Sequence, residues 1–202
     1  MGMRFGVIGP LEVWSDDLAA VAVPGAKERL LLGVLVAAAP GVMSTDRLVD
    51  ALWDGAPPVT ARKSLQAHVV RLRSALEPER PRGSPGRYVV RRGAGYALAV
   101  DRAAIDALQI GDLAARGRAQ LVSGDAEQAA RQAALDLCRW YPYADWPDAP
   151  FADTERRRLA EARAGAVVGL PEATRTMATK KAATRKTAVV VLSRRVSMVD
   201  VS

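Results

Sequence analysis

The sequence predicts an α+β fold for residues 1–100 and an all-α fold for the segment that follows. Three observations support this prediction. Short apolar or β-branched runs separated by turn residues occupy residues 4–23, three segments with helical periodicity come next, and two more short strands close this part of the chain. From Asp101 onward the composition becomes rich in alanine and helical in pattern.

The N-terminal runs predict a small antiparallel sheet. They cover residues 4–8, 11–14 and 18–23, and the segments Gly-Pro and Ser-Asp-Asp separate them. Glycine, proline, serine and aspartate are the residues that tight turns favour. We therefore expect a three-stranded meander at the start of the chain.

Three helices are expected next. Residues 26–39, AKERLLLGVLVAAA, form the first, which the following Pro-Gly pair terminates. The second ends at Trp53, and either Ser44 or Thr45 suits its N-cap. After the helix-breaking stretch DGAPP, the third covers residues 60–76.

The third of these helices combines one apolar stripe with a basic surface. Residues at spacings of four, three and four form the stripe, namely Leu65, Val69, Leu72 and Leu76. The remaining surface displays Arg62, Lys63, Gln66, Val70, Arg71 and Arg73. Because like charges close together on a helix repel one another, we expect an anionic ligand here. A solvated basic face without a ligand is the alternative.

A β-hairpin is predicted to close the first domain. The stretch GRYVVRRGAGYAL contains two strands, 88–90 and 96–99, around Gly93-Ala94-Gly95, where glycine permits the positive φ of a tight turn. Arg91 and Arg92 stand beside this turn. A small sheet, three helices and a terminal hairpin, in this order, outline a winged helix-turn-helix in which the hairpin is the wing.

The remainder of the chain divides into a helical part and a tail. In residues 101–170, the apolar positions Ile105, Leu108, Leu113 and Leu121 can line one helix, residues 126–139 form another, and Asp153 or Thr154 begins a third that runs toward Val168. Paired helices of this kind resemble tetratricopeptide units, although the sequence has no strict 34-residue repeat. Residues 171–202 predict a disordered basic tail.

The charge is concentrated in one region. The chain has 202 residues and a net charge of +7, and residues 59–98 carry nine Lys or Arg against two acidic residues. Local positive charge of this kind favours a polyanionic partner. The sequence has no run of about 18 apolar residues, which predicts a cytoplasmic protein without a membrane partner.

Composition and motifs argue against most enzyme classes. A single cysteine and a single histidine cannot build a disulfide framework, a zinc cluster or a Cys/His catalytic pair within one chain. The sequence contains no P-loop, no GxSxG motif and no metal-ligand spacing. It therefore predicts no catalytic residues, no cofactor and no metal.

Five blocks of sequence occur in an order typical of one family. They are RFGVIGPLEV, ERLLLGVLV, LVDALW, ARKSLQAHVVRLRSALEP and GRYVVRRGAGYAL, and together they resemble the OmpR/PhoB-type winged-helix DNA-binding domain. More narrowly, the chain is similar to the antibiotic regulatory protein (SARP) family of bacterial transcription activators. The similarity continues into DLAARGRAQLVSGDAEQAARQAALDLCRW and TERRRLAEARAGAV, which resemble the start of that family's bacterial transcriptional activation domain, and it covers about residues 3–168.

The resemblance implies a DNA-binding domain at residues 1–100 and a partial activation domain at residues 101–170. Family members usually continue through several more helices, whereas this chain changes character near Gly169. The resemblance therefore also implies a truncated, frameshifted or fused member.

The resemblance assigns DNA contacts by matching position. The third helix is the reading helix of the family, so Lys63, Ser64, His68 and Arg73 are expected to hold the DNA backbone, and Gln66, Ala67, Val70 and Arg71 to face bases. Arg92 has the wing position that enters the minor groove, Arg91 is expected on phosphate, and Arg62 completes the cationic surface. His68 equally suits a satisfied histidine at the edge of the core.

The function that the resemblance implies is transcription activation. Such an activator occupies direct repeats in promoter DNA, as a homodimer on the duplex, recruits RNA polymerase holoenzyme, and controls biosynthetic or secondary-metabolism genes at the nucleoid. The alternative is a helical protein-interaction module that the basic domain tethers to nucleic acid without sequence selectivity.

Overall fold

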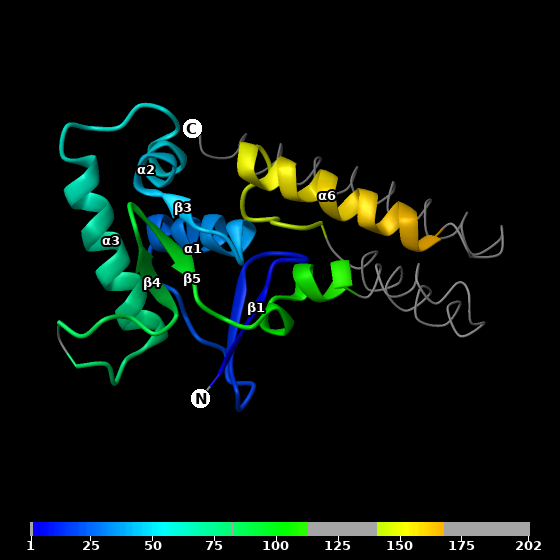
Figure 1. Ribbon diagram of the computed structural model, residues 1–202, viewed down its shortest axis with the longest axis horizontal. Coiled ribbons are helices and arrows are strands. Elements are labelled where there is room, and N and C mark those ends of the chain that lie inside the picture. The colour runs from blue at the N-terminus through cyan, green and yellow to red at the C-terminus, as the bar shows by residue number, and fades with distance from the viewer. Residues whose placement is uncertain (1, 82, 113–140, 168–202) are drawn as a thin grey trace, which may run out of the picture.

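The computed structural model describes residues 2–81, 83–112 and 141–167. Its elements are β1 (Met3–Gly6), β2 (Glu12–Ser15), α1 (Ala26–Ala38), β3 (Met43–Ser44), α2 (Thr45–Trp53), α3 (Ala61–Leu76), β4 (Val89–Arg92), β5 (Gly95–Leu98), the 3₁₀ helix η1 (Arg102–Ala104) and α6 (Pro150–Val167). Residues 106–112 are also helical. Figure 1 shows α1 in the middle of the molecule, with α3 and the β4–β5 hairpin toward one end and α6 toward the other.

The N-terminal sheet has two strands. β1 and β2 pair antiparallel, with Phe5 opposite Val13. The third expected strand is wrong, because residues 18–23 make one isolated bridge, from Ala20 to Trp14, instead of a ladder. Leu18 has a φ of +59°, and this left-handed residue turns the chain tightly after β2. The chain then leaves the sheet toward α1.

The three helices of the first domain confirm the sequence prediction. α1 ends at Ala38, before the Pro-Gly pair. Ser44 is the N-cap of α2, and its hydroxyl oxygen accepts a 3.3 Å hydrogen bond from the backbone N–H of Arg47. The apolar stripe of α3, comprising Leu65, Val69, Leu72 and Leu76, is at most 2% exposed. This stripe packs α3 onto α1 and α2.

The hairpin is part of a three-stranded sheet in the order β3-β5-β4. Its turn is shorter than expected: β4 continues through Arg92, β5 begins at Gly95, and Gly93 has the positive φ, +54°. Strand β3 was not predicted, because two residues are too few to show a period. An added Cβ at Gly95 would collide with the backbone of Met43, so the close approach of β3 requires glycine at this position.

Helix α6 begins at Pro150, earlier than the expected Asp153 or Thr154. Proline is favoured at the first helical position, because it has no N–H to leave unsatisfied and its φ suits a helix. The helix expected at 126–139, the positions Leu113 and Leu121, and the tail 171–202 lie outside the described residues. The tetratricopeptide-like pairing therefore stays a prediction.

The loop 141–149 fastens α6 to the N-terminal sheet and to α1. The backbone N–H of Tyr143 donates to the carbonyl of Val7 at 2.8 Å. Arg156 of α6 donates to four carbonyls of this loop, those of Pro142, Tyr143, Trp146 and Pro147. The ring of Trp146 lies against Gly33 of α1, where an added Cβ would collide with it.

One hydrophobic cluster crosses the expected boundary at residue 100. It joins the core of α1, α2 and α3 to Ile105, Leu108, Tyr143 and Leu159. The division into domains at 100 and 170 stays a prediction, and these contacts give the two sides a shared core.

Candidate nucleic-acid interface

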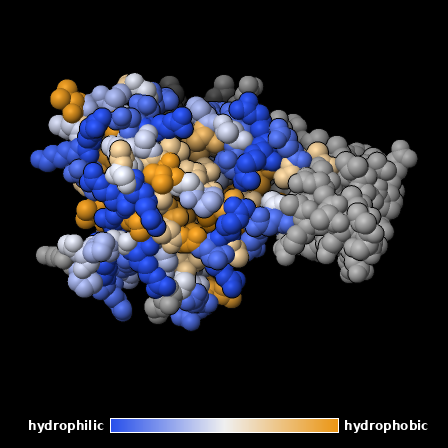
Figure 2. Space-filling view, viewed as in Figure 1, coloured by the Kyte–Doolittle hydropathy of each residue, from blue (hydrophilic) through white to orange (hydrophobic). Residues whose placement is uncertain are grey.

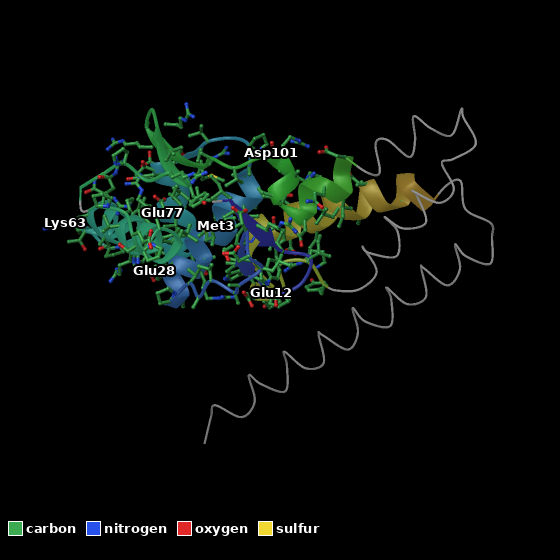
Figure 3. The ribbon with its side chains drawn as sticks, turned by 90° about the horizontal axis from the view of Figure 1, so that it is seen from below. Met3, Glu12, Glu28, Lys63, Glu77 and Asp101 are labelled. Atoms are coloured by element: carbon green, nitrogen blue, oxygen red, sulfur yellow. The ribbon has the colours of Figure 1, made fainter. Side chains whose placement is uncertain are left out.

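Helix α3 turns its polar side outward. Its exposed residues are Arg62, Lys63, Gln66, Ala67, Val70, Arg71 and Ser74, and Ser64, His68 and Arg73 are partly buried. Val70 is an apolar residue in the middle of this face, yet it is 54% exposed. Figure 2 shows hydrophilic side chains gathered over this end of the molecule, and Figure 3 places Lys63 at its outer edge.

The wing carries two further cations. Arg91 and Arg92 are both exposed on β4. Successive side chains of a strand point to opposite sides, so Arg91 shares the side of the buried Val89, and Arg92 lies on the other side. The tip of the hairpin is held in place, because the hydroxyl of Thr45, at the start of α2, donates to the carbonyl of Ala94 at 2.6 Å.

Arg73 connects the helix to the wing. Its Nε donates a 2.8 Å hydrogen bond to the carbonyl of Val89 in β4. Glu77 follows α3 directly, and its Oε1 accepts from the backbone N–H groups of Arg87 and Tyr88 at 2.9 and 3.2 Å. Two side chains at the end of α3 therefore fix the position of the hairpin relative to the helix.

A buried carboxylate lies beneath the outer face of α3. Glu28, in the first turn of α1, has a side chain that is 7% exposed. Its Oε1 lies 2.9 Å from His68 Nδ1 and 2.7 Å from Arg71 Nε. Burial by itself raises the pKa of Glu28, but the hydrogen bond from His68, a hydrogen bond from the backbone N–H of Glu28 and the charges of His68 and Arg71 together outweigh it, so the pKa is lowered below 4.5. Glu28 is therefore a carboxylate at neutral pH.

The cations of α3 differ in how they are held. Arg62 forms a 2.6 Å ion pair with Asp46, and both side chains are more than 70% exposed. Exposed pairs of this kind are weak, so a phosphate can replace Asp46 as the partner of Arg62. His68 and Arg73 instead bind groups within the fold.

Sequence reasoning missed Glu28 and its neighbour Lys27. Lys27 Nζ donates to the carbonyl of Leu52 at the end of α2 and lies 5.1 Å from the centre of the Trp53 ring. The first turn of α1 thus binds both other helices. The signal was present, because Glu28 falls on the apolar stripe of its helix, three and seven residues before Leu31 and Leu35, and a carboxylate in that position needs a cation.

Other kinds of site find no support in the described ranges. Among residues 2–81, 83–112 and 141–167, no group of His, Cys, Asp or Glu could hold a metal ion. In the same part of the chain, no helix is both long and apolar enough to cross a membrane.

Known proteins match this chain in sequence and in structure. Residues 22–98 match the family model for "Transcriptional regulatory protein, C terminal". Regulatory protein AfsR of Streptomyces coelicolor is 34% identical over 164 residues, which are 80% of this chain and 16% of AfsR. Regulatory protein DnrI of Streptomyces peucetius is 27% identical over 81% of this chain and 61% of its own length.

The structural comparison agrees with the sequence matches. The solved structure of Mycobacterium tuberculosis EmbR in complex with a low affinity phosphopeptide superposes with a TM-score of 0.70 and 28% identity, over 81% of this chain and 43% of EmbR. The chain thus spans less than two thirds of each of these relatives. The matched residues include α3 and the wing, and the names of the relatives are those of regulators. Residues 22–98 are therefore similar to the family of the model "Transcriptional regulatory protein, C terminal", and the chain is similar to the regulatory proteins AfsR and DnrI.

Proposed function

We propose that the chain is a sequence-specific DNA-binding regulator that activates biosynthetic or secondary-metabolism genes. The observation that carries this proposal is the fixed relation between the polar face of α3 and the wing, which Arg73 joins by its bond to Val89. A helix flanked by a cationic hairpin can occupy the major groove and an adjacent minor groove at the same time. Because α3 and the wing are held in one fixed arrangement, their cations can meet the DNA in only one alignment along the duplex.

Base recognition falls to the middle of α3. Gln66 and Arg71 are both exposed, and they lie five residues, or about 1.4 helical turns, apart on α3. We assign both to base contacts. An amide pairs bidentately with adenine, and a guanidinium with guanine. Val70 and Ala67 lie beside them and offer apolar contact, which suits a thymine methyl group.

Affinity comes from contacts to phosphate. We assign this role to Arg62, Lys63 and Ser64 on α3 and to Arg91 on the wing, whereas Arg92 enters the minor groove. His68 and Arg73 have partners within the fold: His68 fixes Glu28, which holds Arg71, and Arg73 holds the wing. Phosphate contacts position a protein on the duplex without reading its sequence.

The wider activity of the chain is part of the same proposal. It occupies direct repeats in promoters as a homodimer, works at the nucleoid in the cytoplasm, and recruits RNA polymerase holoenzyme through residues outside the α3 face. The names AfsR and DnrI, which belong to regulatory proteins, support the regulatory part of this assignment.

Selection from a random pool of duplexes tests the proposal. The full chain is expected to enrich a defined sequence, and the Arg71→Ala variant to lose about 5- to 150-fold of its preference at one base pair. Arg92→Ala should lower the affinity for the enriched duplex, because it removes the wing contact in the minor groove next to the bases that α3 contacts. Arg102→Ala serves as the control, because this exposed arginine pairs with Asp112 outside the interface and carries the same charge.

Two outcomes would contradict the proposal. Unchanged affinity of the Arg71→Ala and Arg92→Ala variants for the enriched duplex would exclude α3 and the wing as the interface. Equal affinity of the unaltered chain for enriched and scrambled duplexes would instead favour a protein-interaction module that is tethered to nucleic acid without selectivity.

A further inference from the structure

Arg71 is exposed at one edge and held at another. Its side chain is 59% exposed, yet its Nε lies 2.7 Å from the buried Oε1 of Glu28, and its Nη2 lies 3.1 Å from His68 Nδ1. The Nε/Nη2 edge of the guanidinium thus faces into the protein. An arginine has five N–H donors in a planar fork, so the Nη1/Nη2 edge keeps donors for a second acceptor.

The carboxylate that holds Arg71 is itself fixed in position. His68 Nδ1 lies 2.9 Å from the same Oε1, and in the tautomer with a hydrogen on Nδ1 it donates to Glu28. The His68 ring in turn packs against Trp53, with 6.0 Å between the ring centres. Figure 3 shows Glu28 inward from Lys63, on the core side of α3.

The backbone of α1 makes room for this arrangement. Gly25, the N-cap of α1, has a φ of +81° and no Cβ, and an added Cβ would collide with the carboxylate of Glu28. Only glycine adopts this φ without strain. The sequence thus keeps glycine where a larger residue would displace the carboxylate.

We infer that Glu28 is a positioning residue for base recognition, which holds the Nε/Nη2 edge of Arg71 so that the Nη1/Nη2 edge is presented to a guanine. The inference rests on the proposed function and assigns a specificity role to a residue that does not touch DNA. A free arginine must lose side-chain entropy when it grips a base, whereas an arginine that is already bound along one edge loses less. Glu28 therefore acts on preference at one base pair, not on general affinity.

The test compares base preferences of the full chain and its variants on duplexes taken from the selection above. Arg71→Ala identifies the base pair that Arg71 reads. Glu28→Gln is expected to reduce the preference for guanine at that same pair by at least about fivefold, the lower end of what one bidentate contact contributes. Its slope of log K against log salt should not change, because no phosphate contact is lost.

A double-variant cycle separates positioning from loss of folding. If Glu28 acts through Arg71, the combined variant has the same guanine preference as Arg71→Ala alone, whereas independent effects add. Glu28→Asp keeps the charge but moves the carboxylate away from Arg71, because aspartate is one methylene shorter, so it should give an intermediate guanine preference. This variant replaces Glu28→Gln in the test if Glu28→Gln folds poorly. The matched control is Glu155→Gln in α6, where a carboxylate that is 13% exposed also binds an arginine Nε, that of Arg158, at 2.8 Å.

The outcomes distinguish this inference from the proposed function. If the unaltered chain prefers no sequence, the proposed function and the inference both fall. If Arg71→Ala loses one base pair while Glu28→Gln retains it, the inference alone is overturned. A uniform loss of affinity for all duplexes in Glu28→Gln would also overturn it, because that result assigns Glu28 a purely structural role.

Discussion

Arg73 Nε and the carbonyl oxygen of Val89 lie 2.8 Å apart, and this hydrogen bond connects α3 to the β4–β5 wing. The bond uses a backbone acceptor in β4, two residues before Arg91. The side chain that makes it passes close to Gly86, where an added Cβ would lie 2.5 Å from Arg73 Nε. The position of the wing relative to α3 therefore depends on Arg73 together with Glu77, and on the absence of a side chain at Gly86.

Replacement of Arg73 by alanine should loosen the wing. The carbonyl of Val89 loses its donor, which costs about 1 kcal/mol or more for a partly buried bond to a charged group. Hydrogen exchange in β4 should become faster, and DNA affinity should fall by more than the loss of one charge explains. Lys63→Ala removes the same charge from the exposed face and should leave exchange in β4 unchanged. Equal behaviour of the two variants would show that Arg73 acts only through its charge.

DNA binding should depend steeply on salt. If Arg62, Lys63 and Arg91 contact phosphate, the slope of log K against log salt is roughly −3 for each bound chain. Lys63→Ala and Arg91→Ala should each make this slope less negative by about 0.9, because each removes one phosphate contact. Titration of an enriched duplex at several salt concentrations measures the slope. A slope near zero would mean that the positive surface meets no phosphate.

The stability that Glu28 provides should depend on pH. Its pKa is lower in the folded chain than the ordinary value of 4.5, so its contribution is fully present above 4.5 and is lost as the pH falls through the lower folded value. Urea unfolding at pH 7 should show Glu28→Gln less stable than the unaltered chain by about 1–3 kcal/mol. At pH 3 the difference should shrink. A difference that is constant with pH would contradict the ionised state of Glu28 in the fold.

Asp106 should be essential for joining the N-terminal sheet to the helical part. Its carboxylate accepts hydrogen bonds from the backbone N–H groups of Val7, at 3.0 Å, and Ile8, at 3.1 Å. Burial raises the pKa of Asp106 even though these bonds, together with the N–H of Ala107, lower it. Asp106→Ala leaves buried donors without an acceptor and should lower the free energy of unfolding by about 2–3 kcal/mol in urea titrations.

A control separates this effect from general destabilisation. Asp112 pairs with Arg102 at the surface, where ion pairs contribute little, so Asp112→Ala should lower the free energy of unfolding much less. Equal losses in the two variants would rule out the role of Asp106 as an acceptor for the end of β1.

Local patterns predicted most of the first domain. The stripe of α3 and the N-cap of α2 depend on spacings and residue types within one element, and the structure confirms both. β3 and the true start of α6 were missed. The first depends on pairing with Gly95 far along the chain, and the second lies at Pro150, before the expected starts Asp153 and Thr154. Long-range pairing leaves little trace in a short window of sequence.

The exposed face of the candidate site could be predicted from the sequence, but the residues that hold its side chains in position could not. The exposed face of α3 follows directly from the helical period, which places Lys63, Gln66 and Val70 opposite the buried stripe. The partners of His68 and Arg71 could not be inferred in this way, because Glu28 is 40 residues away from His68 and meets it only after α1 and α3 pack together. The resemblance identified the DNA-contact positions on α3, and the structure adds the side chains that hold those residues in place.

The contact between Gly33 and Trp146 limits which substitutions the protein can accept during evolution. The indole fills the space that any side chain at position 33 would need. A bulkier residue at position 33 is tolerable only if the side chain at position 146 becomes smaller, so we expect the two positions to change together. The contact between α1 and the loop before α6 thus constrains substitutions on both of its sides.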